Sequence, residues 1–431
     1  MENISVNNLT DSTNSSLPRN IKVALAKEVL TQENNIEIAK EKFAEIVKDL
    51  EQKKQKEVVN ATGTVLHTNL GRSPNNISFS GRYTNVEYDL KNFKRGVRNE
   101  YLSSSLSSFL GCEEVTFVNN NASSLYLSLR AMAKNYEFKN VIISRGEIIE
   151  IGGSYRLPEI IQETGLQMIE VGTTNKTNLN DYTKALKDFP NSIILKVHRS
   201  NYSISGFTEE VSIKELSEIK ENYETVLIHD LVSGLVVDRK FLEVNHIDIF
   251  NNESSVQNSL DDGSDLVMFS GDKLVRSVQS GIIAGKSKLI EHIKDYSLFR
   301  TYRCSPLTLF ELQKTATSYI NKDELKIPFW HLISQSYQSL EIRIKNIVSE
   351  SSFEFDIQEG TSLIGGGTLP GVTMKSPVLL IKEEASSSLL NILLNNNIPI
   401  IPHFYKKRIC IDLRSVFEDQ DKIIKTCLNK L

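Results

Sequence analysis

The stretch "LVMFSGDKLVRSVQSGIIAG" (residues 266–285) places one lysine, Lys273, between two apolar runs. Each run has the length and the continuous Val/Ile/Leu character of a strand that is covered on both faces. A charged amine at the end of a buried strand is costly unless it is paired, solvated or neutral. Lys273 is therefore either a free amine that can form a Schiff base or an ordinary surface lysine in a turn.

Apolar runs of the same kind alternate with helical segments between Val115 and about Gly285. They read "VTFV", "NVIIS", "LQMIEVG", "NSIILKVH", "TVLIHD", "DLVMFS" and "SGIIAG". This alternation predicts an α/β fold with a mostly parallel sheet and helices on both sides. Ligands bind at the carboxyl ends of such strands, which is where the polar loops "NNNAS", "SRGE", "HRSNYS", "HDLVSG" and "SGDK" fall.

The two ends of the chain have a different character. Residues 1–57 are predicted to form a disordered tail up to about Ser16, which has little to bury, followed by a short helical unit. Residues 306–431 contain fewer and more alternating strands with helices between them, which is typical of a smaller α+β domain. The large α/β domain is then expected over residues 58–305.

Composition limits the kind of protein. The chain has 431 residues and a net charge of −4, so any polyanion must be bound by a local patch rather than by a global field. The four cysteines form no Cys-x-x-Cys pair, and no apolar run reaches the ~18 residues of a membrane helix. We expect a globular cytoplasmic protein without a signal peptide, and no membrane partner.

Two further segments give Lys273 a chemical context. Asp230 ends the apolar run "VLIHD", where a carboxylate could pair with the ring nitrogen of pyridoxal phosphate, or could simply cap a helix. A strand runs directly into a helix at "VNNNASSLYLSL" (118–129), and a helix N-terminus favours phosphate. Together these positions outline a pyridoxal phosphate pocket of the aspartate-aminotransferase type. The predicted cofactor-binding residues are Lys273, Asp230, Asn119, Asn120, Asn121, Ala122, Ser123 and Ser270.

Longer blocks carry a resemblance to one family. The chain from about Val58 to its end resembles the bacterial L-seryl-tRNA(Sec) selenium transferases, also called selenocysteine synthases. The blocks are "VVNATGTVLHTNLGRSP" (58–74), "NVEYDLKNFKRGVR" (85–98), "ISRGEIIEIGGSYRLPE" (143–159), "EVGTTNKTNLNDY" (170–182), "VHRSNYSISGFTEEVS" (197–212), "FSGDKL" (269–274), "IGGGTLPGVTM" (364–374) and "IDLRSV" (411–416).

The resemblance implies a reaction, partners and further site residues. Seryl-tRNA(Sec) would become selenocysteinyl-tRNA(Sec) through an aminoacrylyl intermediate on pyridoxal phosphate, with selenophosphate as the selenium donor. By resemblance Lys273 is the cofactor lysine and Asp230 the partner of the ring nitrogen. Arg95, Arg98, Arg300 and Arg303 match active-site arginines of the family, and their guanidinium groups suit a compact anion. The family also implies a homo-oligomer built from dimers, such as a decameric ring.

The sequence departs from the family pattern beside Lys273. "RSVQS" (276–280) replaces a Gly-Gly-Pro-Gln-Ala segment, and Val232 replaces a glycine after Asp230. Glycine at such positions permits positive φ or close backbone approach, so a changed loop is expected next to the lysine. Two other functions stay open. One is a pyridoxal phosphate lyase or transferase acting on a small amino acid or phosphorylated amino sugar, and the other is a cofactor-free scaffold of the same fold.

Overall fold

The computed structural model describes residues 5–33, 35–75, 83–151, 155–251, 253–351, 353–365 and 367–430. It divides into two compact units. One comprises Met1–Val58 with Asn397–Pro399, and the other Val59–Asn396 with Ile400–Leu431. No helix within the described ranges has both the length and the apolar character needed to cross a membrane.

The first unit is helical. Its helices are α1 (Val6–Asp11), α2 (Arg19–Gln32) and α3 (Ile36–Lys53). Leu9, Val29 and Phe43 are buried together in its core. The predicted disordered tail is therefore wrong for residues 6–11, because Ser5 caps α1 and this short helix buries Leu9 against the two longer ones.

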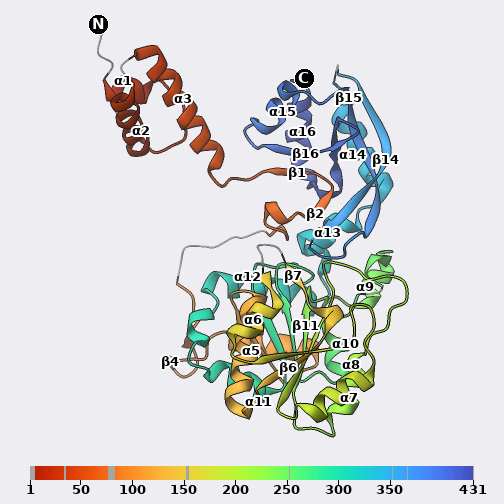
Figure 1. Cartoon of the computed structure of the whole chain (residues 1–431). Coiled ribbons are helices and arrows are strands. Elements are labelled where there is room, and N and C mark those ends of the chain that lie inside the picture. Colours follow the sequence, from red (N-terminus) through yellow and green to blue (C-terminus); the bar gives the residue numbers. More distant parts are fainter. Residues whose placement is uncertain are drawn as a thin grey trace. The chain divides into compact units, whose positions relative to one another are not determined.

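The second unit contains a seven-stranded sheet in the order β5-β13-β12-β11-β10-β6-β9 (Figure 1). Only β13 runs antiparallel to its neighbours, so the prediction of a mostly parallel sheet is confirmed. The strands are β5 (Glu114–Val118), β6 (Asn140–Ser144), β9 (Gln167–Val171), β10 (Ser192–Val197), β11 (Leu227–Val232), β12 (Leu266–Ser270) and β13 (Gly281–Gly285).

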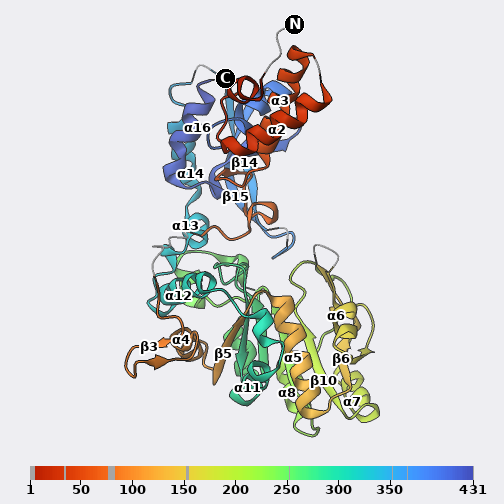
Figure 2. The same cartoon turned by 90° about the vertical axis from the view of Figure 1, so that its left-hand side faces the viewer.

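Helices cover both faces of this sheet, which explains the continuous apolar runs (Figure 2). In β12, Leu266 and Met268 pack toward one face, while Val267 and Phe269 pack toward the other. The first face is covered by α5 (Asn121–Tyr136), α6 (Leu157–Glu163) and α11 (Ser287–Asp295). The second face is covered by α4 (Glu100–Leu110), α7 (Leu179–Asp188), α8 (Ile213–Lys220) and α12 (Pro306–Ile320).

A second sheet has six strands in the order β1-β16-β17-β15-β14-β2. Its strands are β1 (Val59–Ala61), β2 (Thr64–Leu66), β14 (Phe355–Gly365), β15 (Thr373–Glu384), β16 (Ile400–Tyr405) and β17 (Arg408–Asp412). Within the second unit, segments from both sides of the predicted division at residue 305 are combined. β1 pairs with β16 and β2 with β14, while α12 packs against α4 of the large sheet's layer. Such long-range pairing leaves no local sequence signal.

The remaining helices and short strands connect these layers. They are β3 (Tyr88–Asp89), β4 (Lys94–Arg95), β7 (Glu150–Ile151), β8 (Tyr155–Arg156), α9 (Arg239–Val244), α10 (Val256–Asp261), α13 (Pro328–Ser334), α14 (Tyr337–Val348), α15 (Ser387–Leu394) and α16 (Asp421–Leu428). Because β5 and β12 both run antiparallel to β13, the carboxyl ends of all strands except β13 lie at one edge of the large sheet. That edge carries the predicted site.

Candidate active site

Lys273 lies just beyond the carboxyl end of β12 and is 5% exposed. Burial and, to a smaller extent, the nearby positive charge of Arg72 lower the pKa of its amine to about 8. The negative charges of Asp272 and Asp230 act in the opposite direction but are the smaller causes. The structure thus answers the question raised by the sequence. Lys273 is not a surface lysine, and its surroundings favour the neutral amine.

Asp230 occupies the carboxyl end of the neighbouring strand β11 and is 5% exposed. Asn121 donates a side-chain hydrogen bond to its Oδ1 at 2.8 Å, and the Val232 amide donates to the same oxygen at 2.9 Å. Burial raises the pKa of Asp230 to about 6, although both hydrogen bonds oppose this shift. Asp230 is therefore a buried carboxylate at neutral pH, held by donors rather than by a salt bridge.

The N-terminus of α5 closes the same edge, but its side chains are partly engaged. The Asn120 side chain caps the helix, accepting from the Ser123 amide and hydroxyl, each at 2.9 Å. The Asn119 amide donates to the Tyr302 carbonyl at 2.9 Å. Asn120 is therefore the N-cap of α5. A phosphate-binding role for Asn119, Asn120, Asn121, Ala122 and Ser123 stays a prediction.

Gly281 on β13 lets this helix terminus approach the sheet. A Cβ at this position would lie 2.2 Å from the Asn120 carbonyl oxygen and from the Ser124 hydroxyl. Ser270, at the end of β12, pairs with Gly281 in the adjacent strand and is buried. The close approach brings the helix N-terminus, where anions are favoured, to the strand that precedes Lys273.

These residues fit pyridoxal phosphate. The group needs an amine that loses its proton more easily than an ordinary lysine, a carboxylate for its ring nitrogen and donors for its phosphate. Lys273, Asp230 and the start of α5 offer these at one sheet edge. The Asn121 Oδ1 atom is buried without a hydrogen-bond partner among the described residues, which leaves a polar atom beside Asp230 for a ligand to satisfy.

Sequence reasoning missed two contacts at this edge. Arg72 forms an ion pair with Asp272, with 2.7 Å between Nη1 and Oδ2. The Asn75 amide group donates to the Ser277 carbonyl at 3.1 Å, so segment 72–75 is fastened to the loop that carries Lys273. Both residues lie about two hundred positions from their partners. Arg72 lies within the block "HTNLGRSP" and Asn75 directly follows it. This was the only sign in the sequence that they belong to the site.

Two residues of the polar loops "HRSNYS" and "SRGE" have acidic partners. The His198 ring nitrogen Nε2 lies 3.1 Å from Glu253, and Arg145 pairs with Glu170 at 2.8 Å.

Tyr155 was not singled out from the sequence. Burial and the nearby charge of Asp230 raise the pKa of its hydroxyl, which keeps Tyr155 neutral beside the carboxylate.

The arginines form a separate cluster around one carboxylate, Glu87. Arg98 contacts Glu87 at 2.8 Å, Arg95 at 3.1 Å and Arg303 at 3.5 Å. Arg98 also donates to the Cys304 carbonyl at 2.7 Å. The hydrogen bond from Arg98 holds the pKa of Glu87 below its usual range. One negative charge therefore faces three permanent positive charges.

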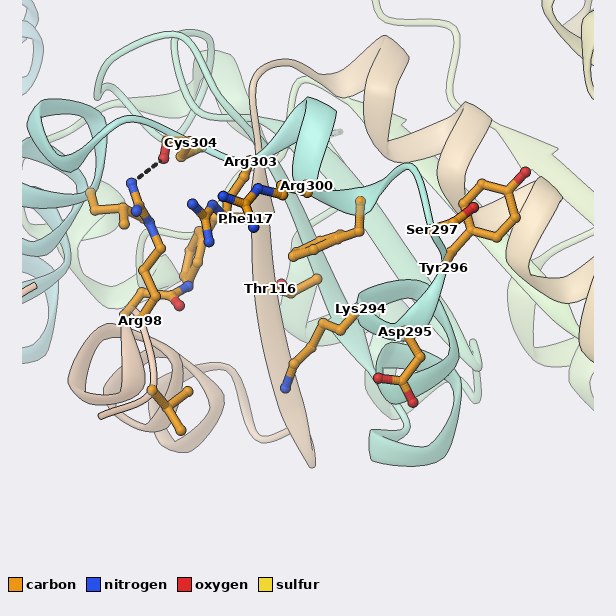
Figure 3. A pocket seen from close by; sticks show the side chains of 14 residues that line it. Arg98, Thr116, Phe117, Lys294, Asp295, Tyr296, Ser297, Arg300, Arg303 and Cys304 are labelled. Atoms are coloured by element: carbon orange, nitrogen blue, oxygen red, sulfur yellow. Dashed lines mark hydrogen bonds between the residues drawn. The ribbon is translucent and has the colours of Figure 1, made fainter. Parts of the chain in front are cut away.

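A cavity of about 510 Å³ opens beside β5 and is lined by Arg98, Arg300 and Arg303, with Lys294 and Asp295 at another part of its rim (Figure 3). Arg95 does not line it and reaches the cluster only through Glu87. Arg300 has no ion-pair partner within the described part of the chain. Among the described residues, Lys273 and Asp230 do not line this cavity.

The fold and the buried lysine define the class: this is an α/β protein with the fold of the aspartate-aminotransferase-type, pyridoxal-phosphate-dependent enzymes. Among solved structures it is similar to D-glucosaminate-6-phosphate ammonia-lyase, with a TM-score of 0.57, 16% identity, and coverage of 89% of this chain and 97% of that one.

Sequence comparison then gives the family. The L-seryl-tRNA selenium transferase family model matches residues 58–417, and the chain belongs to this family. The chain is 37% identical to the L-seryl-tRNA(Sec) selenium transferase of Aliarcobacter butzleri, covering 89% of this chain and 85% of that protein. It is 35% identical to the transferase of Campylobacter fetus, covering 94% of this chain and 91% of that protein. The family resemblance read from the sequence is confirmed.

Proposed function

We propose that this chain converts the serine of seryl-tRNA(Sec) into selenocysteine, with pyridoxal phosphate held at Lys273. The observation that carries the proposal is the family match over residues 58–417, which spans the whole sheet edge with Lys273, Asp230 and Asn121. The cofactor, when bound, supplies an electron sink that stabilises a carbanion at the serine α-carbon. The residues of the chain bind, orient and move protons around it.

Lys273 and Asp230 have distinct tasks in this proposal. The Lys273 amine, with a pKa of about 8, can take the serine α-proton at Nζ and return it after the β-substituent has been exchanged. Asp230 would hold a proton at the ring nitrogen, since a buried carboxylate strongly favours a positive partner. Asn121 and the Val232 amide fix the orientation of that carboxylate.

The arginine cavity suits the selenium donor. Selenophosphate is a compact anion, and guanidinium groups bind its oxygens through paired, charge-assisted hydrogen bonds. Arg98, Arg300 and Arg303 present three such groups to one cavity. Arg300, which is exposed and has no ion-pair partner among the described residues, is the group best placed to bind an incoming anion.

We also propose a homo-oligomer in which two copies complete each active site. The support is that the arginine cavity and the Lys273 edge are both present in the chain but do not line one cavity. Mixing two inactive variants tests this. If sites are shared between copies, Lys273→Ala subunits mixed with Arg300→Ala subunits regain activity, because some sites receive both intact residues. Activity that stays at the level of the separate variants would contradict sharing.

A direct assay tests the function itself. The purified protein is incubated with pyridoxal phosphate, seryl-tRNA(Sec) and selenophosphate, and the esterified amino acid is identified by mass spectrometry. Selenocysteine is the expected product. Borohydride reduction, followed by peptide mapping, should place a pyridoxyl label on Lys273. Absence of the label after incubation with excess cofactor would refute cofactor chemistry at this residue.

Filter binding separates the transferase from an enzyme of small substrates. If the protein is the transferase, less protein should be needed to retain seryl-tRNA(Sec) on the filter than to retain unfractionated tRNA. If it is a lyase for small amino acids, the same protein concentration should retain both RNAs. The similarity to the ammonia-lyase, at 16% identity, shows the fold alone and supports no second function. Equal retention combined with a labelled Lys273 would favour the small-substrate alternative.

A further inference from the structure

Arg276 lies three residues after the candidate cofactor lysine and is completely buried. Its guanidinium carbon lies 3.3 Å from the ring centroid of Phe329, 5.3 Å from that of Trp330 and 5.6 Å from that of Phe250. These three rings form an aromatic cage, in which the cation is stabilised by the π faces rather than by a carboxylate. The cage therefore holds the side chain of a residue that lies in the loop following Lys273.

Arg276 closes a turn on the backbone of Lys273. Its Nη1 donates to the Lys273 carbonyl at 3.0 Å, and its own amide donates to the same oxygen at 3.2 Å. The Tyr319 hydroxyl donates a hydrogen bond to the carbonyl of Val275, two residues after Lys273, at 2.9 Å. The backbone around Lys273 is thus held by the side chains of Arg276 and Tyr319.

The conformation of this turn is one that side chains disfavour. Arg276 has φ +66° and Val232, on the strand beside it, has φ +56°. Left-handed backbone costs roughly 1–2 kcal/mol for a residue other than glycine. Glycine adopts this backbone conformation most easily, and neither position is a glycine. The side chain of Arg276 must therefore supply compensating contacts.

The charge of Arg276 is not required for packing. Burial lowers the pKa of its guanidinium to about 9, which shows that the surroundings disfavour the cation. No carboxylate pairs with it, and its Nε and Nη2 have no hydrogen-bond partner within the described ranges. An apolar side chain of similar length would fill the same cage at equal or lower free energy. What such a side chain could not do is donate to the Lys273 carbonyl.

We propose that Arg276 is a positioning residue that fixes the backbone of Lys273, so that the amine is held toward the cofactor. This inference rests on the proposed function, in which Lys273 binds pyridoxal phosphate. Arg276 contacts neither substrate nor cofactor in this proposal. It acts through the carbonyl of Lys273, by a hydrogen bond from a guanidinium group that the aromatic cage holds in place.

Arg276→Met separates positioning from stability. Methionine keeps the contact with the aromatic rings but removes the donor, so the melting temperature should stay equal or rise. The concentration of pyridoxal phosphate that gives half-maximal borohydride-trapped label on Lys273 should rise roughly tenfold or more, the usual effect of losing one hydrogen bond from a charged group. Arg276→Lys, which keeps a donor, should recover part of this affinity.

Arg343→Met is the matched control. Arg343 is also a buried arginine that donates to a backbone carbonyl, that of Val416, but it lies in the small domain and pairs with Asp421 at 2.6 Å. Its removal leaves a carboxylate unpaired, so the melting temperature should fall while labelling of Lys273 is unchanged. The two variants should therefore show opposite patterns.

A second measurement does not depend on cofactor binding. Hydrogen exchange of the unloaded protein reports on the Leu274 amide, which donates to the Ser233 carbonyl at 3.0 Å, and on the Ser277 amide, which donates to the Gly271 carbonyl at 2.8 Å. Both amides should exchange faster in Arg276→Met and not in Arg343→Met. Unchanged exchange together with unchanged labelling would overturn the proposal. If the unmodified protein does not become labelled, the proposed function is refuted. Faster hydrogen exchange in Arg276→Met would in that case still support the role of Arg276 in fixing the turn.

Discussion

The Lys273 edge and the arginine cavity place positive groups in opposite environments. Lys273 is 5% exposed, and its pKa is lowered to about 8, whereas in the cavity the Arg303 side chain is 32% exposed and Arg300 faces solvent. This difference in exposure agrees with the role proposed for each group. A base must lose its charge near pH 7, which burial promotes, while an anion-binding group must keep its charge, which the guanidinium does in water.

The two regions also use their carboxylates differently. At the lysine edge, Asp272 is buried and paired with one arginine, Arg72. In the cavity region, Glu87 is shared among Arg95, Arg98 and Arg303, so the local charge remains positive. Binding at the first region should therefore respond to pH, and binding at the second to ionic strength.

Lys273→Ala should have the largest effect. The amine is the proposed base and cofactor ligand, so selenocysteine formation should fall below detection, while the melting temperature changes little or rises because a buried amine is removed. The assay is conversion of seryl-tRNA(Sec) with selenophosphate, with circular dichroism to monitor the fold. Lys286→Ala, which removes an exposed lysine paired with Asp265, is the control. Residual activity equal to that of the control would exclude Lys273 as the base.

Arg300→Ala should separate the two regions. Loss of one charge-assisted contact should lower selenium incorporation by roughly ten- to a hundredfold, whereas borohydride labelling of Lys273 and consumption of serine continue. Arg145→Ala, which removes an exposed arginine paired with Glu170, should change neither. A fully active Arg300 variant would show that this residue does not bind the donor.

Arg72→Gln should shift a pH profile. The Arg72 charge lowers the pKa of Lys273 and Asp272 raises it, so removing the arginine should raise that pKa above about 8. The pH dependence of labelling by pyridoxal phosphate should then move to higher pH, with less label formed at pH 7. Asp272→Asn should move the profile to lower pH by the same reasoning. Shifts in the same direction for both variants would contradict this electrostatic account.

Glu87→Gln should have the smallest effect. The change removes the carboxylate that competes with an anion for three arginines, so the KM for selenophosphate should fall a fewfold, and more at low salt than at high salt. Exposed ion pairs contribute only about 0–1 kcal/mol each, which limits the size of the change. A rise in KM would mean that Glu87 mainly orients the arginines.

The sequence predicted the large sheet well because the signal is local. Each of the seven apolar runs became a strand, since residues covered on both faces must all be apolar. Lys273 and Asp230 were found for the same reason, because a polar residue that ends such a run must lie at the sheet edge. Their catalytic roles stay a prediction. The helix over Val6–Asp11 was missed because its few apolar residues are buried only by neighbouring helices.

By itself, the sequence determined the order of the strands along the chain, the polar edge and the identity of the lysine, because these depend on periodicity and on neighbouring residues. Only the tertiary structure decided which distant groups meet: Arg72 with Asp272, the arginines around Glu87, β1 beside β16, and Arg276 within its aromatic cage. Charge pairing and cation–π contacts act over a few ångströms of space, whatever the separation along the chain. The pKa of Lys273 depends on those contacts and could not be read from the chain alone.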